Sequence, residues 1–153
     1  MRHEYIEPVV NACMGTLASV IRSDVKQGKV SAVPGEERAA DIAVVVGLHG
    51  DSEGHIALHM GTVTAVNIAA RLFETEFDAL TPAGLDALAE LANMVAGNVV
   101  SSLNERGFDF SMTPPRVLAA GQAPGKAAGP ESFRIPFTTD CGEVTVQAAF
   151  HSR

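Results

Sequence analysis

Apolar residues occupy every second position in two segments of the chain, and this alternation limits the possible folds more than any other feature. One segment spans residues 42–60 around an Asp/Gly-rich turn at 50–54, and the other spans 133–150 around a turn at 140–142. Successive side chains of a strand point to opposite faces, so a period of two predicts strands with one buried face. Each segment therefore predicts a β-hairpin, the first with a loop of about five residues.

Three other segments carry apolar residues at helical spacing and could cover the buried face of these hairpins. They span residues 4–22, 62–73 and 82–106. Thr62 is the expected N-cap of the second segment. The third and longest has Thr81 as its expected N-cap and Pro82 at the first helical position, and Gly107 should end it.

The predicted elements follow one order twice. A helix, an extended segment and a hairpin occur in the first third of the chain and again in its last half, where the extended segment lies near 113–120. Two such halves can pair their strands into one antiparallel sheet. We therefore predict an α+β fold in a single domain over residues 1–153, with helices on one face of the sheet. Loops are expected at 34–38 and 121–130.

The charge balance excludes one large class of function. The 153 residues include 11 Lys or Arg and 18 Asp or Glu, which gives a net charge of −7. Nucleic-acid binding needs a basic footprint, and anionic membrane surfaces attract basic segments, so neither partner is expected. No run reaches the roughly 18 apolar residues of a membrane span.

The first residues and the cysteines indicate a cytoplasmic protein. Glu4 and Glu7 stand where a signal peptide would carry basic residues followed by an apolar run. Cys13 and Cys141 lie far apart and match no metal-binding or redox spacing. This usage is typical of idle or buried thiols in a reducing compartment.

The longest predicted helix has a polar stripe of unusual composition. Asp86, Glu90, Asn93 and Gly97 fall on one narrow side of it, at steps of four, three and four residues. The Cβ atoms of Glu90 and Asn93 would lie about 5–6 Å apart. A solvated polar face is the simplest interpretation, since every surface helix has one. Asparagine, however, is a poor mid-helix residue unless its amide has a task.

The residues of this stripe resemble a known signature. The run DALAELANMVAGN at 86–98, followed by Pro114-Pro115, is similar to the motif of the CheC/CheX/FliY phosphatases of bacterial chemotaxis. The hairpin at 46–58 also resembles the strand pair of CheX. CheC carries a second copy of the helix motif, which is absent here because Asn11 is one step out of register with Glu7. The resemblance therefore favours a CheX-type member and its fold.

The resemblance implies hydrolysis of the aspartyl phosphate of a CheY-type response regulator. An acyl phosphate is already activated, so the attacking water needs placement more than it needs a strong base. Asn93 would orient that water with its carboxamide, and Glu90 would contact a lysine of the receiver active site. The alternative is a non-catalytic docking or assembly module on the same fold, as in the related flagellar-switch proteins.

The same resemblance implies how the chain meets its partner. Asp86, Gly97, Asn98 and Pro115 would contact the receiver around the catalytic pair. The receiver's carboxylates would hold the Mg²⁺ of the reaction, so the chain would need no metal site of its own. A homodimer formed through its strands is also implied.

Three histidines form the remaining candidate site. His55 and His59 share one face of the first hairpin, and His49 lies across it. They could bind a transition metal, but no carboxylate or cysteine completes a catalytic set. Exposed strand histidines without a ligand are the simpler interpretation.

Overall fold

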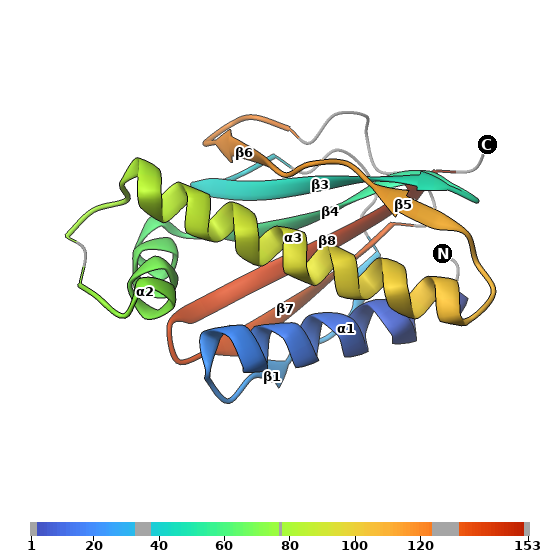
Figure 1. The fold of residues 1–153 in the computed structure, drawn as a ribbon, viewed down its shortest axis with the longest axis horizontal. Coiled ribbons are helices and arrows are strands. Elements are labelled where there is room, and N and C mark those ends of the chain that lie inside the picture. The colour runs from blue at the N-terminus through green and yellow to red at the C-terminus, as the bar shows by residue number, and fades with distance from the viewer. Residues whose placement is uncertain (1–2, 33–37, 77, 124–131, 152–153) are drawn as a thin grey trace.

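All the strands that the structure describes pair into one antiparallel sheet, which forms one layer of the molecule (Figure 1). The computed structural model describes residues 3–32, 38–76, 78–123 and 132–151, so most of the loops expected at 34–38 and 121–130 lie outside the described residues. The helices are α1 (His3–Ile21), α2 (Thr62–Phe73) and α3 (Pro82–Glu105). The strands are β1 (Lys26–Gln27), β2 (Ser31–Ala32), β3 (Ile42–Gly50), β4 (Glu53–Met60), β5 (Phe110–Met112), β6 (Arg116–Ala119), β7 (Phe133–Thr139) and β8 (Gly142–His151).

The two halves of the chain interlock in this sheet. The strand order is β1-β7-β8-β4-β3-β5, with β2 also on β7 and β6 also on β3. β4 and β8 pair at the centre, from Glu53↔His151 to Met60↔Val144. The short strands of each half pair with the hairpin of the other half. The repeated element order therefore corresponds to an exchange of strands between the halves.

All three helices pack on the same face of the sheet (Figure 1). The even-numbered residues of β3 and β4 point toward them, and Val44, Val46 and Leu58 are completely buried there. Tyr5 of α1 joins this core, its ring centroid 4.3 Å from that of Phe150 on β8. The alternation of the sequence thus gave the correct buried face, and the predicted α+β fold is confirmed.

The ends of α3 lie where the sequence predicts them. The Thr81 hydroxyl accepts a hydrogen bond from the Gly84 N–H at 3.0 Å, and Pro82 is the first helical residue. Gly107 has φ +95°, a conformation that favours glycine, and it redirects the chain after the helix. None of the helices in the described ranges is both long enough and apolar enough to cross a membrane.

The N-cap predicted for α2 is wrong. Gly61 is the N-cap and offers no side chain, while Thr62 is already helical. The carboxylate of Asp41 replaces the missing cap, since its Oδ2 accepts a hydrogen bond from the Thr62 N–H at 3.0 Å. A tertiary contact therefore satisfies this helix end, and the local sequence pattern does not reveal it.

The first hairpin is tighter than predicted. β3 continues to Gly50 and β4 begins at Glu53, so two residues separate the strands. Both ends extend because other strands pair with them, Gly50 with Phe110 of β5 and Glu53 with His151 of β8. Strands β1 and β2 lie in the extended segment predicted between the first helix and the first hairpin, but their bounds were not predicted. Strand β5 was missed, because three residues are too few to show a period.

Candidate functional site

Helix α3 exposes its polar stripe because its opposite side is buried. Leu88, Leu91 and Val95 have no exposed surface, whereas Glu90 is exposed and Asn93 is half-buried. Side chains at positions i and i+3 leave a helix on the same side, with Cβ atoms about 5–6 Å apart. A carboxylate and a carboxamide therefore face the same space outside the helix.

The chain returns to this stripe along the edge of the sheet. After α3 ends at Glu105, β5 and β6 run along β3 in the reverse sense to the helix (Figure 1). The helix covers about 18 Å between Asn93 and Glu105 at 1.5 Å per residue. An extended chain covers about 17 Å between Phe110 and Pro115 at 3.3 Å per residue. The distance back along the extended chain matches the distance along the helix, so Pro115 lies beside Asn93.

Residues 110–115, which we call the return segment, are held by paired hydrogen bonds at two points. Asn104 holds its start: the Asn104 amide donates to the Phe110 carbonyl at 3.1 Å and accepts from the Phe110 N–H at 2.9 Å. Thr113 is held on β3, donating its N–H to the Gly47 carbonyl at 3.0 Å and accepting the Gly47 N–H on its hydroxyl at 2.9 Å. A Cβ at position 47 would lie 2.7 Å from that hydroxyl oxygen, so glycine allows the close approach.

A shallow groove of about 420 Å³ lies between α3 and the return segment. We call it the polar groove, and it is lined by Asp86, Ala89, Glu90, Asn93, Met112, Thr113, Pro114 and Pro115. The extended segment predicted at 113–120 is interrupted here, because residues 113–115 form the wall and β6 begins only at Arg116. The two prolines cannot donate to a strand ladder, which explains the break.

The polar groove suits a reaction in which another molecule supplies the reactive group. It offers carboxylates and a carboxamide on one side and a hydroxyl and two prolines on the other. These groups can hold a water molecule or contact a cation, but none is a nucleophile paired with a base. Its open form allows a group presented by another protein to reach Asn93.

Two of the residues expected to contact a partner do not line the polar groove. Gly97 is half-buried one turn further along α3, and a Cβ there would meet nothing within 4 Å. Asn98 turns toward α1, where its Nδ2 donates to the Thr16 hydroxyl at 2.7 Å. Conversely, Met112 and Thr113 line the groove but were missed, because only the path of the return segment brings them there.

The three histidines do not converge. His49 Nδ1 lies 2.6 Å from the Glu53 carboxylate, and His59 Nε2 lies 3.3 Å from the Gln147 amide oxygen. His55 is buried, with 7% of its surface exposed, although an exposed position was expected. Among the residues that the structure describes, no group of three or more His, Cys, Asp or Glu side chains could hold a metal ion.

Two comparisons with known proteins decide the family. The family model described as chemotaxis phosphatase CheX matches residues 42–138. The CheY-P phosphatase CheX of Thermotoga maritima is 30% identical over an alignment of 126 residues, and the alignment covers 79% of this chain and 81% of that protein. The chain belongs to the CheX family of chemotaxis phosphatases. The predicted family is thereby confirmed, and the matched range contains all of α3 and the return segment.

Solved structures of CheX proteins have the same fold. The chemotaxis protein CheX from Desulfovibrio desulfuricans superposes with a TM-score of 0.84 at 23% identity, over 97% of this chain and 99% of that one. A chain of the CheX–CheY–BeF₃–Mg²⁺ complex from Borrelia burgdorferi gives a TM-score of 0.81 at 29% identity, over 99% of this chain and 100% of that one. The fold is thus shared along nearly the whole length of these proteins.

Proposed function

We propose that this member of the CheX family hydrolyses the aspartyl phosphate of a CheY-type response regulator. The polar groove carries the proposal, because it sets a half-buried asparagine and an exposed glutamate, three residues apart on α3, against a wall with two prolines. Family membership supports the same reaction, since the relative from T. maritima is a CheY-P phosphatase.

Asn93 is the residue that we assign to the attacking water. Its carboxamide oxygen can accept a hydrogen bond from that water, while its NH₂ group can donate to a phosphoryl oxygen. The water attacks phosphorus in line with the bond to the aspartyl oxygen. That P–O bond breaks and the receiver's aspartate leaves as a carboxylate. The water's oxygen and one of its protons become part of inorganic phosphate, and the other proton is released to solvent.

Glu90 is assigned to the lysine of the receiver active site. Glu90 is exposed, and no described residue forms an ion pair with it. A charge-assisted contact with that lysine would fix the register of the two proteins and so place the phosphoryl group over Asn93. Asp86 would add to the attraction one turn earlier, and Pro115 would contact the receiver from the opposite wall.

The metal ion of the reaction belongs to the receiver in this proposal. Mg²⁺ bound by receiver carboxylates would neutralise charge on the phosphoryl oxygens, so the polar groove need supply only the water and the register. The CheX–CheY complex from B. burgdorferi supports this assignment, because it contains Mg²⁺ together with CheY.

Two further properties accompany the proposed function. We propose a homodimer, supported by Val117, which is 39% exposed on the edge strand β6, where a second chain could pair. Sedimentation equilibrium would test it. We also propose a cytoplasmic location, which the buried and unpaired thiols of Cys13 and Cys141 favour.

The test of the activity uses the CheY-type receivers encoded in the same genome. Each receiver is phosphorylated with a small phosphodonor and Mg²⁺, the donor is removed, and loss of the phosphoryl group is followed with and without the protein. At least one receiver should lose phosphate faster, and Glu90→Ala should chiefly weaken binding of that receiver. If no receiver responds to the wild type, the docking-module alternative replaces the enzyme.

A further inference from the structure

A second groove lies on the other flank of the polar stripe of α3. It has a volume of about 400 Å³ and differs from the polar groove in being almost entirely apolar. We call it the apolar groove, and it is lined by Val20, Leu72, Phe73, Asp86, Ala87, Glu90, Leu91 and Met94. Asp86 and Glu90 line both grooves, so they form a ridge that separates the two.

The apolar groove contains two large apolar side chains that are partly exposed. Phe73 is 47% exposed and Met94 is 40% exposed, and both belong to the groove. Scattered exposed apolar residues are ordinary, whereas two that share one groove make a candidate binding surface. Methionine adapts its shape to different partners, and an aromatic ring offers much contact area at low entropic cost.

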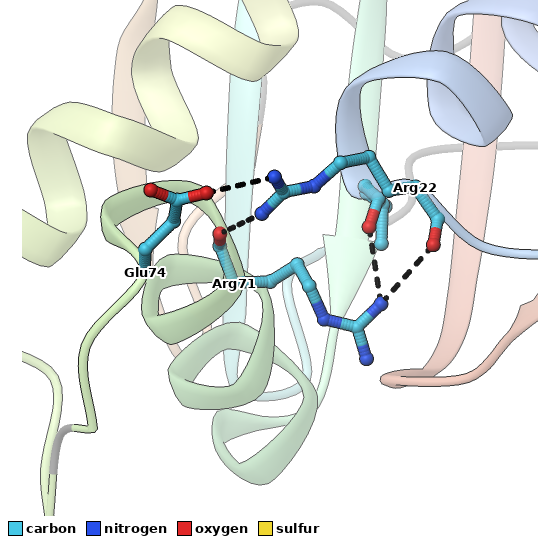
Figure 2. Close-up of polar contacts among 4 residues, drawn as sticks. Arg22, Arg71 and Glu74 are labelled. Atoms are coloured by element: carbon cyan, nitrogen blue, oxygen red, sulfur yellow. Dashed lines mark hydrogen bonds and ion pairs between the residues drawn. The ribbon is translucent and has the colours of Figure 1, made fainter.

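The ends of α1 and α2, two of the helices that line this groove, are joined by contacts that we call the arginine clasp (Arg22, Arg71 and Glu74; Figure 2). Arg71 donates to the carbonyls of Ile21 and Arg22 at 3.1 and 3.4 Å. Arg22 donates in return to the Arg71 carbonyl at 3.0 Å and to the Glu74 carboxylate at 2.9 Å. Val20 and Phe73 lie at these two helix ends, so the clasp joins the two segments that carry them.

The ridge of two carboxylates adds a charge preference. Asp86 and Glu90 are one turn apart on α3, where like charges repel, and no described residue forms an ion pair with either. A basic side chain beside the ridge would relieve this repulsion. The surface thus fits a partner that presents an apolar side chain with a lysine or arginine near it.

The size of a protein interface links the apolar groove to the receiver. A stable interface covers roughly 800 Å² on each partner, much more than the stripe itself. A receiver that places its phosphoryl group at Asn93 and its lysine at Glu90 must also contact the protein surface on either side of the ridge. The apolar groove begins at Glu90 itself, so it is continuous with the proposed contact.

We propose that the apolar groove seats an apolar side chain of the phosphorylated receiver, and that a basic residue of the receiver lies beside it, next to Asp86. This inference rests on the proposed function and names the surface that selects the receiver. The polar groove then performs the hydrolysis, and the apolar groove determines which receiver remains bound long enough to be hydrolysed.

The experiment separates binding from chemistry. The variants Phe73→Ala and Met94→Ala are compared with the wild type for binding to the receiver loaded with beryllofluoride and Mg²⁺, and for the rate constant of phosphoryl loss at saturating protein. Each variant should bind about tenfold more weakly, as truncation of a central interface side chain does. The rate constant at saturation should be unchanged.

Val63→Ala is the matched control, because Val63 is 75% exposed on the same helix as Phe73 but lines neither groove. It should bind the receiver as the wild type does, and circular dichroism should show that all variants are folded. Binding by Phe73→Ala and Met94→Ala within twofold of the wild type would overturn the inference and leave the proposed function intact. A wild type that neither binds nor accelerates any receiver would overturn both.

Discussion

Asn98 offers the sharpest distinction between a structural residue and a contact residue on α3. Its amide donates to the Thr16 hydroxyl of α1 at 2.7 Å, and that hydroxyl donates in turn to the Ala12 carbonyl at 2.7 Å. Thr16 is buried, with 4% of its surface exposed, so water replaces a lost partner there only poorly. We predict that Asn98→Ala lowers stability and leaves phosphatase activity unchanged.

The magnitude follows from two opposing contributions. Loss of one neutral hydrogen bond at a buried hydroxyl costs about 1 kcal/mol. Alanine is a better helix former than asparagine by roughly 0.5 kcal/mol, which offsets part of the loss. The net free energy of unfolding should therefore fall by only about 0.5 kcal/mol. Because this change is small, the single variant alone would not identify its cause.

A double-mutant cycle isolates the contact. Asn98→Ala, Thr16→Val and the double variant are unfolded in urea, and the coupling free energy between the two positions is calculated. The hydrogen bond predicts a coupling of about 1 kcal/mol. A coupling below roughly 0.3 kcal/mol would refute the structural role. Slower dephosphorylation by Asn98→Ala would return this residue to the partner-contact surface implied by the family resemblance.

Three further predictions concern other parts of the fold. Burial raises the pKa of the Cys13 thiol from 9.0 to about 12, so ionisation favours the unfolded chain above pH 9. Stability should fall by about 2 kcal/mol between pH 8 and pH 10.5, and thermal melts of Cys13→Ala should show a weaker decline. Thr81→Ala removes the N-cap of α3 and should cost about 1 kcal/mol in urea unfolding, whereas Thr81→Ser should cost little. Gly47→Ala crowds the Thr113 hydroxyl and so shifts the wall of the polar groove. This variant should dephosphorylate the receiver about tenfold more slowly or worse, while circular dichroism shows that the fold is retained. A wild-type rate would show that the position of this wall does not matter for the reaction.

The sequence predicted those parts of the fold that depend on local pattern. The period of two gave the buried faces of both hairpins, and the Thr81-Pro82 start and Gly107 stop gave the ends of the long helix. Prediction from the sequence failed where contacts between distant residues determine the structure. Asp41 caps α2 across the fold, and β5 exists because it pairs with the end of β3 and is clamped by Asn104.

In the candidate site, too, the sequence predicted the features that depend on local pattern and missed those that depend on distant residues. Helical periodicity alone placed Asp86, Glu90 and Asn93 on one stripe, and the family resemblance supplied Pro115 as their neighbour. The apolar groove was not predicted, because its two exposed side chains come from different helices and meet only in the folded chain. Met94 gave a weak signal, since an apolar residue directly after Asn93 stands at the edge of a polar stripe.

The proposal that Asn93 positions the attacking water is tested most directly by single-turnover dephosphorylation at saturating protein. Asn93→Ala should slow phosphoryl loss by about 100-fold or more toward the spontaneous rate, while binding the beryllofluoride-loaded receiver as tightly as the wild type. Ser101→Ala, at an exposed position about two turns further along α3, serves as the control and should match the wild type. If Asn93→Ala dephosphorylates the receiver at the wild-type rate, Asn93 does not hold the water and the account of the polar groove is wrong.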